Sequence, residues 1–283
     1  MSRSLRSALA ATSVAALLVL TACASGSGGD ATDAGGDDEG WVTPGKITIA
    51  TGEPAYYPWV IDDAPESGEG FEAAVAYAVA DQLGFSKDDV VWVRTGFDEA
   101  IAPGPKDFDV NLQQFSISDE RKQAVDFSSP YYETTQVVIT TGSSPAADAT
   151  SIADLQGLLI GAQTGTTSFT AIEESIQPTQ GAQAFNTNED AKLALENGQI
   201  DALVVDLPTA FYIAGAELSD GVVVGQLPNP EGTTGDQFGL VLAKDSPLTA
   251  DVTAAVDALR ESGALDDIAA EWLGGDDQAP LLK

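Results

Sequence analysis

The sequence predicts an α/β protein made of two lobes, and two observations lead to this prediction. Residues 46–95 contain a short buried strand, a helix with regular apolar spacing and a second strand, which is the repeating unit of a parallel sheet. The same alternation of strands and helices recurs at residues 158–206, where a strand, a Gly-rich turn, two helices and another strand follow one another. A chain of 283 residues is long enough for two such units.

The two regions also share a spacing of polar residues. Each has a threonine, an aspartate three positions later and a second aspartate 14 positions after the threonine. The two sets are Thr95, Asp98 and Asp109, and Thr187, Asp190 and Asp201. Although one such match can arise by chance, it agrees with two lobes of similar structure.

The elements of the first region follow from local patterns. Ile47 and Ile49 belong to a short buried strand that ends in a loop of glycine, proline and aromatic residues. In residues 70–85 the apolar residues recur at helical spacing until Gly84 ends the helix. Residues 90–95, "VVWVRT", are typical of a strand.

The first 45 residues indicate export. Two arginines precede an apolar stretch at about residues 8–20, which is too short and wrongly flanked for a membrane span. "LTAC" at its end resembles the bacterial lipobox, so we expect residues 1–22 to be a signal peptide and Cys23 to be lipidated. An ordinary signal peptide with an incidental cysteine is the alternative. The rest of residues 23–45 is rich in Gly, Ser, Ala and Asp and reads as a disordered tether.

Composition excludes several kinds of function. The chain has 44 acidic and 12 basic residues, a formal net charge of −32, so it is not expected to bind nucleic acid. It has no histidine, which excludes a Ser-His-Asp triad, a histidine general base and a histidine metal site. We expect no metal and no cofactor, and any enzymatic activity would have to use carboxylates, lysine, serine or tyrosine.

Arg121 lies where a cation is unusual. In "NLQQFSISDER", Ser118 is a natural N-cap, and Arg121 falls at about the third position of the helix that it would begin. A cation there costs a few tenths of a kcal/mol, roughly, because the helix dipole is already positive. Free N–H groups, the hydroxyls of Ser116 and Ser118 and the guanidinium would suit a bound carboxylate. An exposed Arg121, or one paired with an acid such as Asp126, is the alternative.

Other residues complete a candidate site. The turn "TGTTS", residues 164–168, precedes a helix, and Asp206 ends an apolar strand just before Pro208. A carboxylate at the carboxyl end of a parallel strand faces the crevice where α/β folds bind ligands, although a solvated loop acid or helix cap would look the same. The aromatic residues on loops after strands suit either ligand stacking or core packing: Tyr56, Tyr57, Trp59 and Phe97. A cation for a carboxylate and a carboxylate for an ammonium together indicate a receptor for a zwitterionic α-amino acid.

Six segments of the chain, in this order, resemble the type II periplasmic amino-acid-binding proteins, the family 3 solute-binding proteins of ABC importers. The segments are "ITIATGEPAYYPWV", "GFEAAVAYAVADQLGF", "FSISDERKQAVDFSSPYY", "IGAQTGTTS", "NGQIDALVVD" and "IAAEWLG". The resemblance covers about residues 46–275. It implies two Rossmann-like lobes joined by two hinge segments, near 132–136 and 233–238, that close on a ligand. The implied parts are lobe 1 at 46–134 plus 236–276, lobe 2 at 135–235, and a tail at 277–283.

The resemblance also implies roles for particular residues. Arg121, helped by Ser116, would hold the α-carboxylate of the ligand. Thr166 and Thr167 match positions in the second lobe that reach the same carboxylate.

At the other end of the ligand, Asp206 would take the α-ammonium, with Gln114 as a second contact. Tyr56 and Phe97 match the aromatic walls around the ligand side chain. Glu53 lies near a position where some relatives carry an acid.

Three features depart from the family pattern. An extra residue in "TGEPAYY" leaves Gly52 as the alternative to Glu53. Gln114 occupies a position that is usually small. Pro103 and Pro105 interrupt the helix that usually follows Phe97.

The expected function is that of a monomeric lipoprotein on the outer face of the cell membrane that is not an enzyme. It would deliver a polar or basic L-amino acid to an ABC permease. Acidic ligands are disfavoured unless Arg94 reaches the pocket. One alternative is an enzyme resembling cyclohexadienyl dehydratases, with Glu53 or Glu72 as proton donor, and another is a ligand sensor for a membrane receptor.

Overall fold

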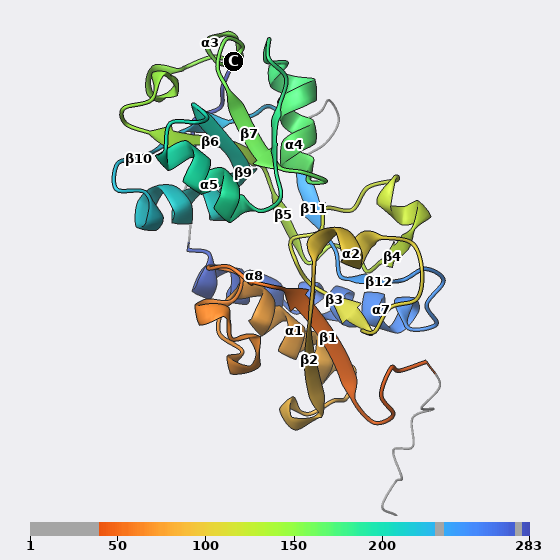
Figure 1. Ribbon diagram of the computed structural model, residues 1–283. Coiled ribbons are helices and arrows are strands. Elements are labelled where there is room, and N and C mark those ends of the chain that lie inside the picture. The colour runs from red at the N-terminus through yellow and green to blue at the C-terminus, as the bar shows by residue number, and fades with distance from the viewer. Residues whose placement is uncertain (1–39, 230–234, 275–278) are drawn as a thin grey trace, which may run out of the picture. The chain divides into compact units, whose positions relative to one another are not determined.

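The computed structural model describes residues 40–229, 235–274 and 279–283 (Figure 1). The predicted signal peptide, Cys23 and most of the predicted tether lie outside these residues. Within the described ranges, no helix has both the length and the apolar character needed to cross a membrane. The predicted α/β class is confirmed, because two mixed sheets are each covered by helices.

The first sheet has five strands in the order β2-β1-β3-β12-β4. β1 pairs in parallel with both β2 and β3, whereas β12 is antiparallel to β3 and β4. Four of its strands precede residue 128, but β12 comes from the far end of the chain. The strands are β1 (Ile47–Gly52), β2 (Val90–Thr95), β3 (Val110–Asn111), β4 (Val125–Phe127) and β12 (Val241–Ala243).

The second sheet repeats this arrangement, in the order β8-β7-β9-β6-β10. β7 is parallel to β8 and β9, and β6 is antiparallel to β9 and β10. Here the antiparallel fourth strand, β6, comes before the parallel strands. The strands are β6 (Gln136–Thr141), β7 (Ile160–Gln163), β8 (Gln183–Phe185), β9 (Ala202–Asp206) and β10 (Gly221–Gln226).

A two-stranded ribbon runs between the sheets (Figure 1). β5 (Tyr132–Thr134) pairs antiparallel with β11 (Asp236–Phe238), so the chain leaves the first sheet along β5 and returns to it along β11. These strands coincide with much of the two hinge segments expected from the resemblance, although residues 233–234 are outside the described part. The lobe boundaries and the hinge motion stay predictions.

The helices fall into two groups. The longest ones in the described chain, α1 and α7, cover the first sheet, and most of the others accompany the second sheet (Figure 1). The α-helices are α1 (Phe71–Gln82), α2 (Phe97–Ile101), α3 (Ile152–Leu155), α4 (Thr167–Ala171), α5 (Asn188–Glu196), α6 (Leu207–Tyr212), α7 (Thr249–Glu261) and α8 (Ala264–Trp272). π-Helical turns extend α4 (Ile172–Ile176) and α6 (Ile213–Glu217), and 3-10 turns lie at Ile61–Asp63, Pro65–Ser67, Lys87–Asp89, Arg121–Gln123 and Pro145–Asp148.

The shared threonine and aspartate spacing has a structural basis. The carboxylate of Asp109, just before β3, accepts a hydrogen bond from the N–H of Thr48 in β1 at 2.6 Å. The carboxylate of Asp201, just before β9, accepts one from the N–H of Leu159, just before β7, at 2.8 Å. Both aspartates therefore join the start of one parallel strand to its neighbour, as expected for two related lobes.

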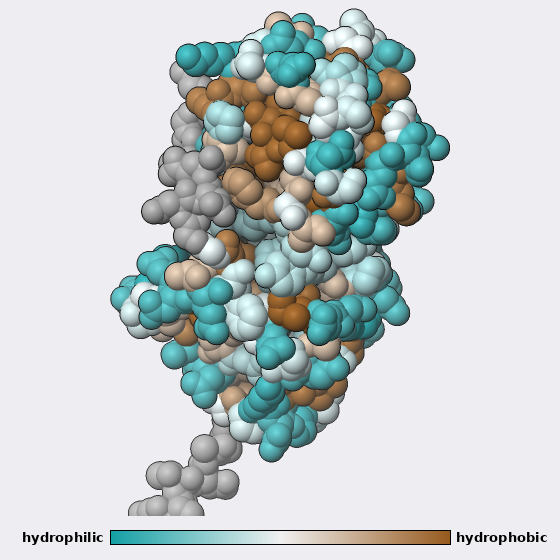
Figure 2. All heavy atoms as spheres, turned by 90° about the vertical axis from the view of Figure 1, so that its left-hand side faces the viewer, coloured by the Kyte–Doolittle hydropathy of each residue, from teal (hydrophilic) through white to brown (hydrophobic). Residues whose placement is uncertain are grey.

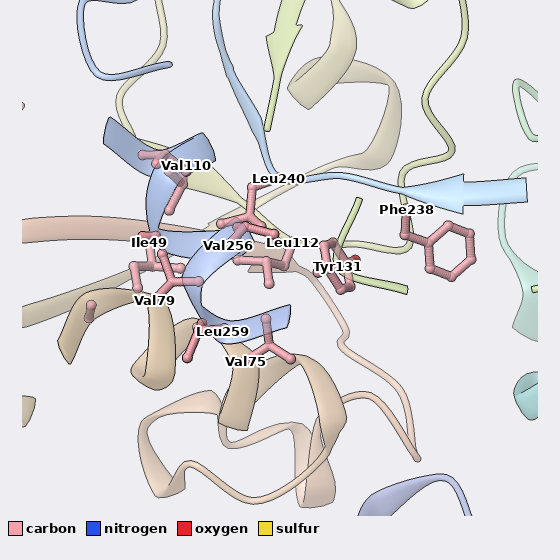
Figure 3. Packing of buried hydrophobic residues seen from close by; sticks show 14 of the residues in the cluster. Ile49, Val75, Val79, Val110, Leu112, Tyr131, Phe238, Leu240, Val256 and Leu259 are labelled. Atoms are coloured by element: carbon pink, nitrogen blue, oxygen red, sulfur yellow. The ribbon is translucent and has the colours of Figure 1, made fainter. Parts of the chain in front are cut away.

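Apolar side chains hold each sheet to its helices. In the first lobe, Ile49 of β1 packs with Val75 and Val79 of α1 and with Val256 and Leu259 of α7 (Figure 3). In the second sheet successive buried side chains of β9 (202–205) alternate between two core clusters. Leu203 and Val205 contribute to one core cluster, while Ala202 and Val204 contribute to another. This is the pattern of a strand buried on both faces.

Two prolines end the helix after Phe97, as predicted. α2 stops at Ile101, and Pro103 and Pro105 lie in the loop that follows. Lys106 completes the stop, because its Nζ donates to the carbonyl oxygens of Glu99 at 3.0 Å and Ala102 at 2.6 Å. Unpaired carbonyls at a helix end need such partners.

The surface is mixed in character. Figure 2 shows hydrophilic residues over much of one face, with a hydrophobic patch on the lobe that contains the second sheet. Isolated exposed apolar side chains are ordinary at protein surfaces. The large exposed ones in the described residues are Val42, Tyr57, Val91, Leu193 and Leu281.

A glycine pair tests how the loop after β1 packs on α1. Gly70 has φ of +103°, and a Cβ there would lie 2.6 Å from the carbonyl oxygen of Trp59. Gly84 has φ of +89° with no atom within 4 Å of its Cβ position. We expect Gly84→Ala to lower the free energy of unfolding by about 1 kcal/mol through backbone strain alone. Gly70→Ala should lower it by about 2 kcal/mol more, because backbone must also move.

Urea unfolding followed by circular dichroism measures both values. Equal losses in the two variants would contradict the close packing of Gly70 against Trp59.

Candidate ligand-binding site

One cavity of about 300 Å³ is lined by residues from both lobes. The first lobe contributes residues from the loops after β1, β2 and β3, and the second contributes residues after β7, β8 and β9. These are the carboxyl ends of the parallel strands, where α/β sheets usually place ligands. All nine residues expected to bind a ligand line this cavity: Glu53, Tyr56, Phe97, Gln114, Ser116, Arg121, Thr166, Thr167 and Asp206. Their individual roles toward a ligand stay predictions.

Arg121 spans the two lobes at the cavity. Its Nη1 donates to the carbonyl oxygen of Ser116 at 2.7 Å, and its Nη2 donates to that of Gly165 at 2.8 Å. The guanidinium lies 5.4 Å from the ring centroid of Phe97, a cation–π arrangement. Phe97 is in turn stacked on Phe115 with 4.8 Å between ring centroids.

The local structure around Arg121 differs from the predicted helix. Ser118 does accept a hydrogen bond from the N–H of Arg121 at 3.2 Å, but only a single 3-10 turn, Arg121–Gln123, follows. The chain must enter β4 at Val125, so no room remains for a longer helix. The expected cost of a cation near a helix dipole is therefore small here.

The alternative partner for Arg121 is also excluded. Asp126 pairs with Lys244 at 2.9 Å and accepts a hydrogen bond from Thr249 at 3.0 Å. The ion pairs found in the described part of the chain do not include Arg121. Burial lowers the pKa of Arg121, and the surrounding acids only partly offset this effect. Arginine nevertheless stays protonated in proteins, so Arg121 is a cation without a direct ionic partner among the described residues.

The second lobe faces Arg121 with hydroxyl groups. Thr166 caps α4, because its Oγ1 accepts a hydrogen bond from the N–H of Phe169 at 3.1 Å and donates to the carbonyl of Gln163 at 2.6 Å. Thr167 Oγ1 of the second lobe is in direct hydrogen-bond contact with Ser116 Oγ of the first lobe at 3.1 Å. The hydroxyl of Thr166 is therefore occupied, whereas the pair formed by Ser116 and Thr167 joins the two lobes beside Arg121.

Asp206 lies in a second charged region of the lining. Gln136 donates from Nε2 to Asp206 Oδ1 at 2.9 Å and to Asp236 Oδ2 at 2.7 Å. Burial and the nearby charge of Asp236 raise the pKa of Asp206 to about 8, against the lowering effects of Gln136 and Arg121. A cation placed next to Asp206 would favour its ionised form.

Gln114 has an unusual backbone and an acidic neighbour. Its φ is +53°, the left-handed conformation that favours glycine, which fits a family position that is usually small. Its backbone N–H donates to Glu72 Oε1 at 2.7 Å, and its side-chain Nε2 donates to Glu72 Oε2. Tyr131 also donates its hydroxyl to Glu72 Oε1. Glu72 is 1% exposed, and burial raises its pKa to about 7.

Acidic groups dominate the charge of the lining. It includes Glu53, Asp98 and Glu99 besides Asp206, and Arg121 is its one basic residue among those described. Gly52 and Glu53 both line the cavity, so the choice between them stays open. This charge distribution suits a ligand with a positive side chain better than one with a negative side chain.

Arg94 does not alter this charge distribution. It is not among the residues that line the cavity, and its guanidinium bonds to Asp63 at 2.5 Å and to the carbonyl oxygen of Gly52 at 2.6 Å.

The loop aromatics separate into two kinds. Tyr56 and Phe97 line the main cavity, whereas Trp59 is 1% exposed and belongs to the core, as the packing alternative predicted. Trp59 Nε1 donates to Thr209 Oγ1 at 3.0 Å. The ring of Tyr57 lies 4.4 Å from that of Tyr212. These two contacts join the lobes beside a smaller cavity of about 20 Å³ that also includes Tyr56, Gln114 and Asn188.

Sequence reasoning missed several polar lining residues. Most follow the end of a parallel strand by one to four positions, and that position is the signal that could have identified them. They are Gln113, Gln163, Asn186, Asn188, Asp98 and Glu99. Among the residues that the structure describes, no group of three or more Cys, Asp or Glu is arranged to hold a metal ion.

Comparison with known proteins assigns the family. The family model of bacterial extracellular solute-binding proteins, family 3, matches residues 47–275. This chain belongs to that family. The resemblance in sequence motifs is thereby confirmed, together with the two-lobe fold.

Two relatives and one solved structure illustrate the range of this solute-binding family. The L-arginine-binding protein of Pseudomonas aeruginosa is 29% identical over 231 residues, covering 79% of this chain and 86% of that protein. Glutamate-binding protein GluB of Corynebacterium efficiens is 26% identical over 281 residues, covering 95% and 91%. An ancestral arginine-binding protein bound to glutamine has a TM-score of 0.67 at 28% identity, covering 82% of this chain and 99% of that one.

The raised pKa of Asp206 predicts how the stability of this solute-binding protein depends on pH. Between about pH 4 and pH 8 the ligand-free folded state holds a proton on Asp206 that the unfolded state has lost. The free energy of unfolding should therefore fall as the pH rises through this range. Asp206→Asn should reduce the difference in the free energy of unfolding between pH 5 and pH 8 by about 1–2 kcal/mol. The effect is kept to this size because Asp206 is only partly buried.

Urea unfolding of stripped protein at the two pH values measures this difference. Asp251→Asn, on the exposed side of α7, is the control and should leave it unchanged. An identical pH dependence in Asp206→Asn and the wild type would contradict the raised pKa.

Proposed function

We propose that this solute-binding protein captures a free L-α-amino acid with a polar or basic side chain and does not transform it. The observation that carries this proposal is the placement of Arg121 and Asp206 in the lining of one cavity, each without an opposite charge paired to it. A zwitterion supplies both missing partners.

The carboxylate of the ligand would lie at Arg121. A guanidinium binds a carboxylate through two parallel hydrogen bonds, and a buried site makes such bonds stronger than they are in water. Ser116 and Thr167 lie beside it and offer hydroxyl groups. Phe97 holds the guanidinium from one side, so the arginine is already positioned before the ligand arrives.

The ammonium of the ligand would lie at Asp206. In the ligand-free protein, burial and the charge of Asp236 raise the pKa of Asp206. The negative charge of ionised Asp206 therefore has too little positive charge near it for full compensation. An ammonium group would compensate it and release its proton. Binding below about pH 8 is therefore expected to release protons.

The side chain of the ligand would extend toward Glu53, Asp98 and Glu99, with Tyr56 and Phe97 as apolar walls. Several acids and an aromatic wall favour a guanidinium or ammonium group. The named relatives support this class, because one of those compared above is an arginine-binding protein. Another is a glutamate-binding protein, so family membership by itself does not select the side chain.

The cellular role follows from the family and from the first residues of the chain. We infer that Cys23 carries a lipid anchor on the outer face of the cell membrane and that a monomer delivers its ligand to an ABC permease. The segment after Cys23, rich in small and acidic residues, would let the folded part move near the membrane.

The dehydratase alternative receives no support from Glu72. That carboxyl accepts three hydrogen bonds behind Gln114 and is absent from the cavity lining, so it is not placed to give a proton to a bound substrate. Glu53 is in the lining, and a turnover assay addresses it. The sensor alternative requires the same ligand and differs only in the partner.

A thermal-shift screen tests the binding function. The soluble domain without Cys23 would be partly unfolded to remove bound ligand, refolded and tested against the twenty amino acids and ornithine. A micromolar ligand at millimolar concentration stabilises the folded state by about 4 kcal/mol. We expect one amino acid or a few related ones to raise the melting temperature. A silent panel would contradict amino-acid binding and would direct the next assay to turnover of a cyclohexadienyl substrate.

Arg121→Ala should remove most of the affinity for every amino acid that binds. Loss of a charged, buried hydrogen-bonding partner costs about 2–5 kcal/mol, so Kd should rise at least about thirtyfold. The melting temperature of the ligand-free protein should stay within a few degrees. Isothermal titration calorimetry measures Kd.

Arg260→Ala is the matched control, because Arg260 is an exposed arginine that pairs with Asp257 at 2.6 Å. It should bind like the wild type. Normal affinity in Arg121→Ala would overturn the assignment of the carboxylate site.

A further inference from the structure

Gln114 and the buried Glu72 behind it form an arrangement that Arg121 and Asp206 do not account for. Although the resemblance places Gln114 near the ligand ammonium, Gln114 also lies beside the expected side-chain wall, because it lines both cavities together with Tyr56. Gln114 therefore lies at the boundary of the main cavity and the smaller one. Its Nε2 is bonded to Glu72 Oε2. The remaining polar atom of the amide, Oε1, is bonded to no residue among those described.

The two oxygens of Glu72 have different partners. Oε1 accepts from the backbone N–H of Gln114 and from the hydroxyl of Tyr131, whereas Oε2 accepts from Gln114 Nε2. An ionised carboxylate only accepts hydrogen bonds. When Glu72 is ionised it can therefore bond to the NH₂ group of Gln114 but not to its oxygen, and this determines which way round the amide lies.

We propose that Glu72 is a positioning residue that orients the Gln114 amide with its oxygen toward the cavity, so that this wall selects ligand side chains carrying only hydrogen-bond donors. The inference rests on the proposed function and deepens it. A guanidinium or ammonium group offers donors alone, whereas a ureido or carboxamide group also presents an oxygen that Gln114 Oε1 would repel.

The neighbouring glutamine is oriented in the same way by independent contacts. Gln113 also lines the cavity, and its Nε2 donates to Thr95 Oγ1 at 2.8 Å and to Asn111 Oδ1 at 3.1 Å. Its NH₂ group is thereby bound to protein oxygens, which leaves Oε1 as the free polar atom. Two consecutive amides thus contribute acceptors to a wall that already contains Glu53.

Glu72→Gln tests the orientation directly. The new side chain has the same shape, and its oxygen can take the two donors that Oε1 now accepts. Its NH₂ group then occupies the place of Oε2 and donates, so Gln114 must turn its oxygen inward and its Nε2 toward the cavity. The variant keeps the same number of hydrogen bonds while inverting the polarity of the wall.

Arginine and citrulline are the probes, because they have the same length and differ in a guanidinium against a ureido group. Kd for each would be measured by calorimetry at about pH 8, where Glu72 is largely ionised. We expect the wild type to prefer arginine. The ratio of Kd for citrulline to Kd for arginine should fall about tenfold in Glu72→Gln.

Tyr131→Phe is the matched control. It removes one donor to Glu72 Oε1 from the same buried group but leaves the bond from Gln114 Nε2 to Oε2. Loss of the Tyr131 hydrogen bond raises the pKa of Glu72, so this variant and the wild type are compared at a pH high enough to keep Glu72 ionised in both. Its ratio of Kd values should then stay within about twofold of the wild type, even if its melting temperature falls. An equal fall of the ratio in both variants would overturn the proposal, since it would indicate general loosening.

An unchanged ratio in folded Glu72→Gln would also overturn it. If that variant does not fold, Gln114→Met decides: a ratio about tenfold lower supports the role of the amide, and a wild-type ratio refutes it. A wild type that binds other amino acids but neither probe contradicts this inference alone. A wild type that binds nothing in the amino-acid panel contradicts the proposed function as well.

Discussion

The antiparallel pairing of β5 with β11 is the constraint on which both sheets and the cavity depend. The chain leaves the first sheet before that sheet is complete, builds the second one, and returns along β11 to supply β12. Gln136, at the start of β6, connects this ribbon to the cavity, because its one NH₂ group bonds to Asp236 in β11 and to Asp206 at the end of β9. The same residues therefore determine chain topology and hold the charged lining in position.

Arg121 and Asp206, two ionisable groups of the cavity lining, have no ion-pair partner of opposite charge among the described residues of the ligand-free protein. Arg121 bonds only to carbonyl oxygens, and Asp206 shares a neutral amide with a second carboxylate. Buried groups of this kind cost free energy unless a partner of opposite charge is present. A zwitterionic ligand would supply both partners at once, which is the physical reason for the proposed capture of such a ligand. The two glutamine amides add hydrogen-bond acceptors without adding charge, because their NH₂ groups are bonded to the protein and their oxygens are bonded to none of the residues that the structure describes.

Much of the fold and the set of lining residues could be predicted, because both follow from local patterns. The helix at 71–82 and the strands around it are visible in the spacing of apolar residues, and Pro103 and Pro105 explain the short α2. The helix expected at Arg121 was wrong. Its cap is present, but the start of β4 leaves space for one 3-10 turn only. Local signals identify where a helix begins and do not report how soon the next strand must form.

The sequence by itself determined the two-lobe class, the family and nine of the residues that line the cavity, because these follow from local patterns and motifs. Only the tertiary structure decided which partner each polar group has. Arg94 bonds to Asp63, Asp126 takes Lys244, and Glu72 accepts from Tyr131, a residue 59 positions away. Such pairings depend on how distant segments approach one another. The orientation of the Gln114 amide is also decided by the tertiary structure, since Gln114 lies in the loop after β3 and the carboxylate that orients it is buried in α1.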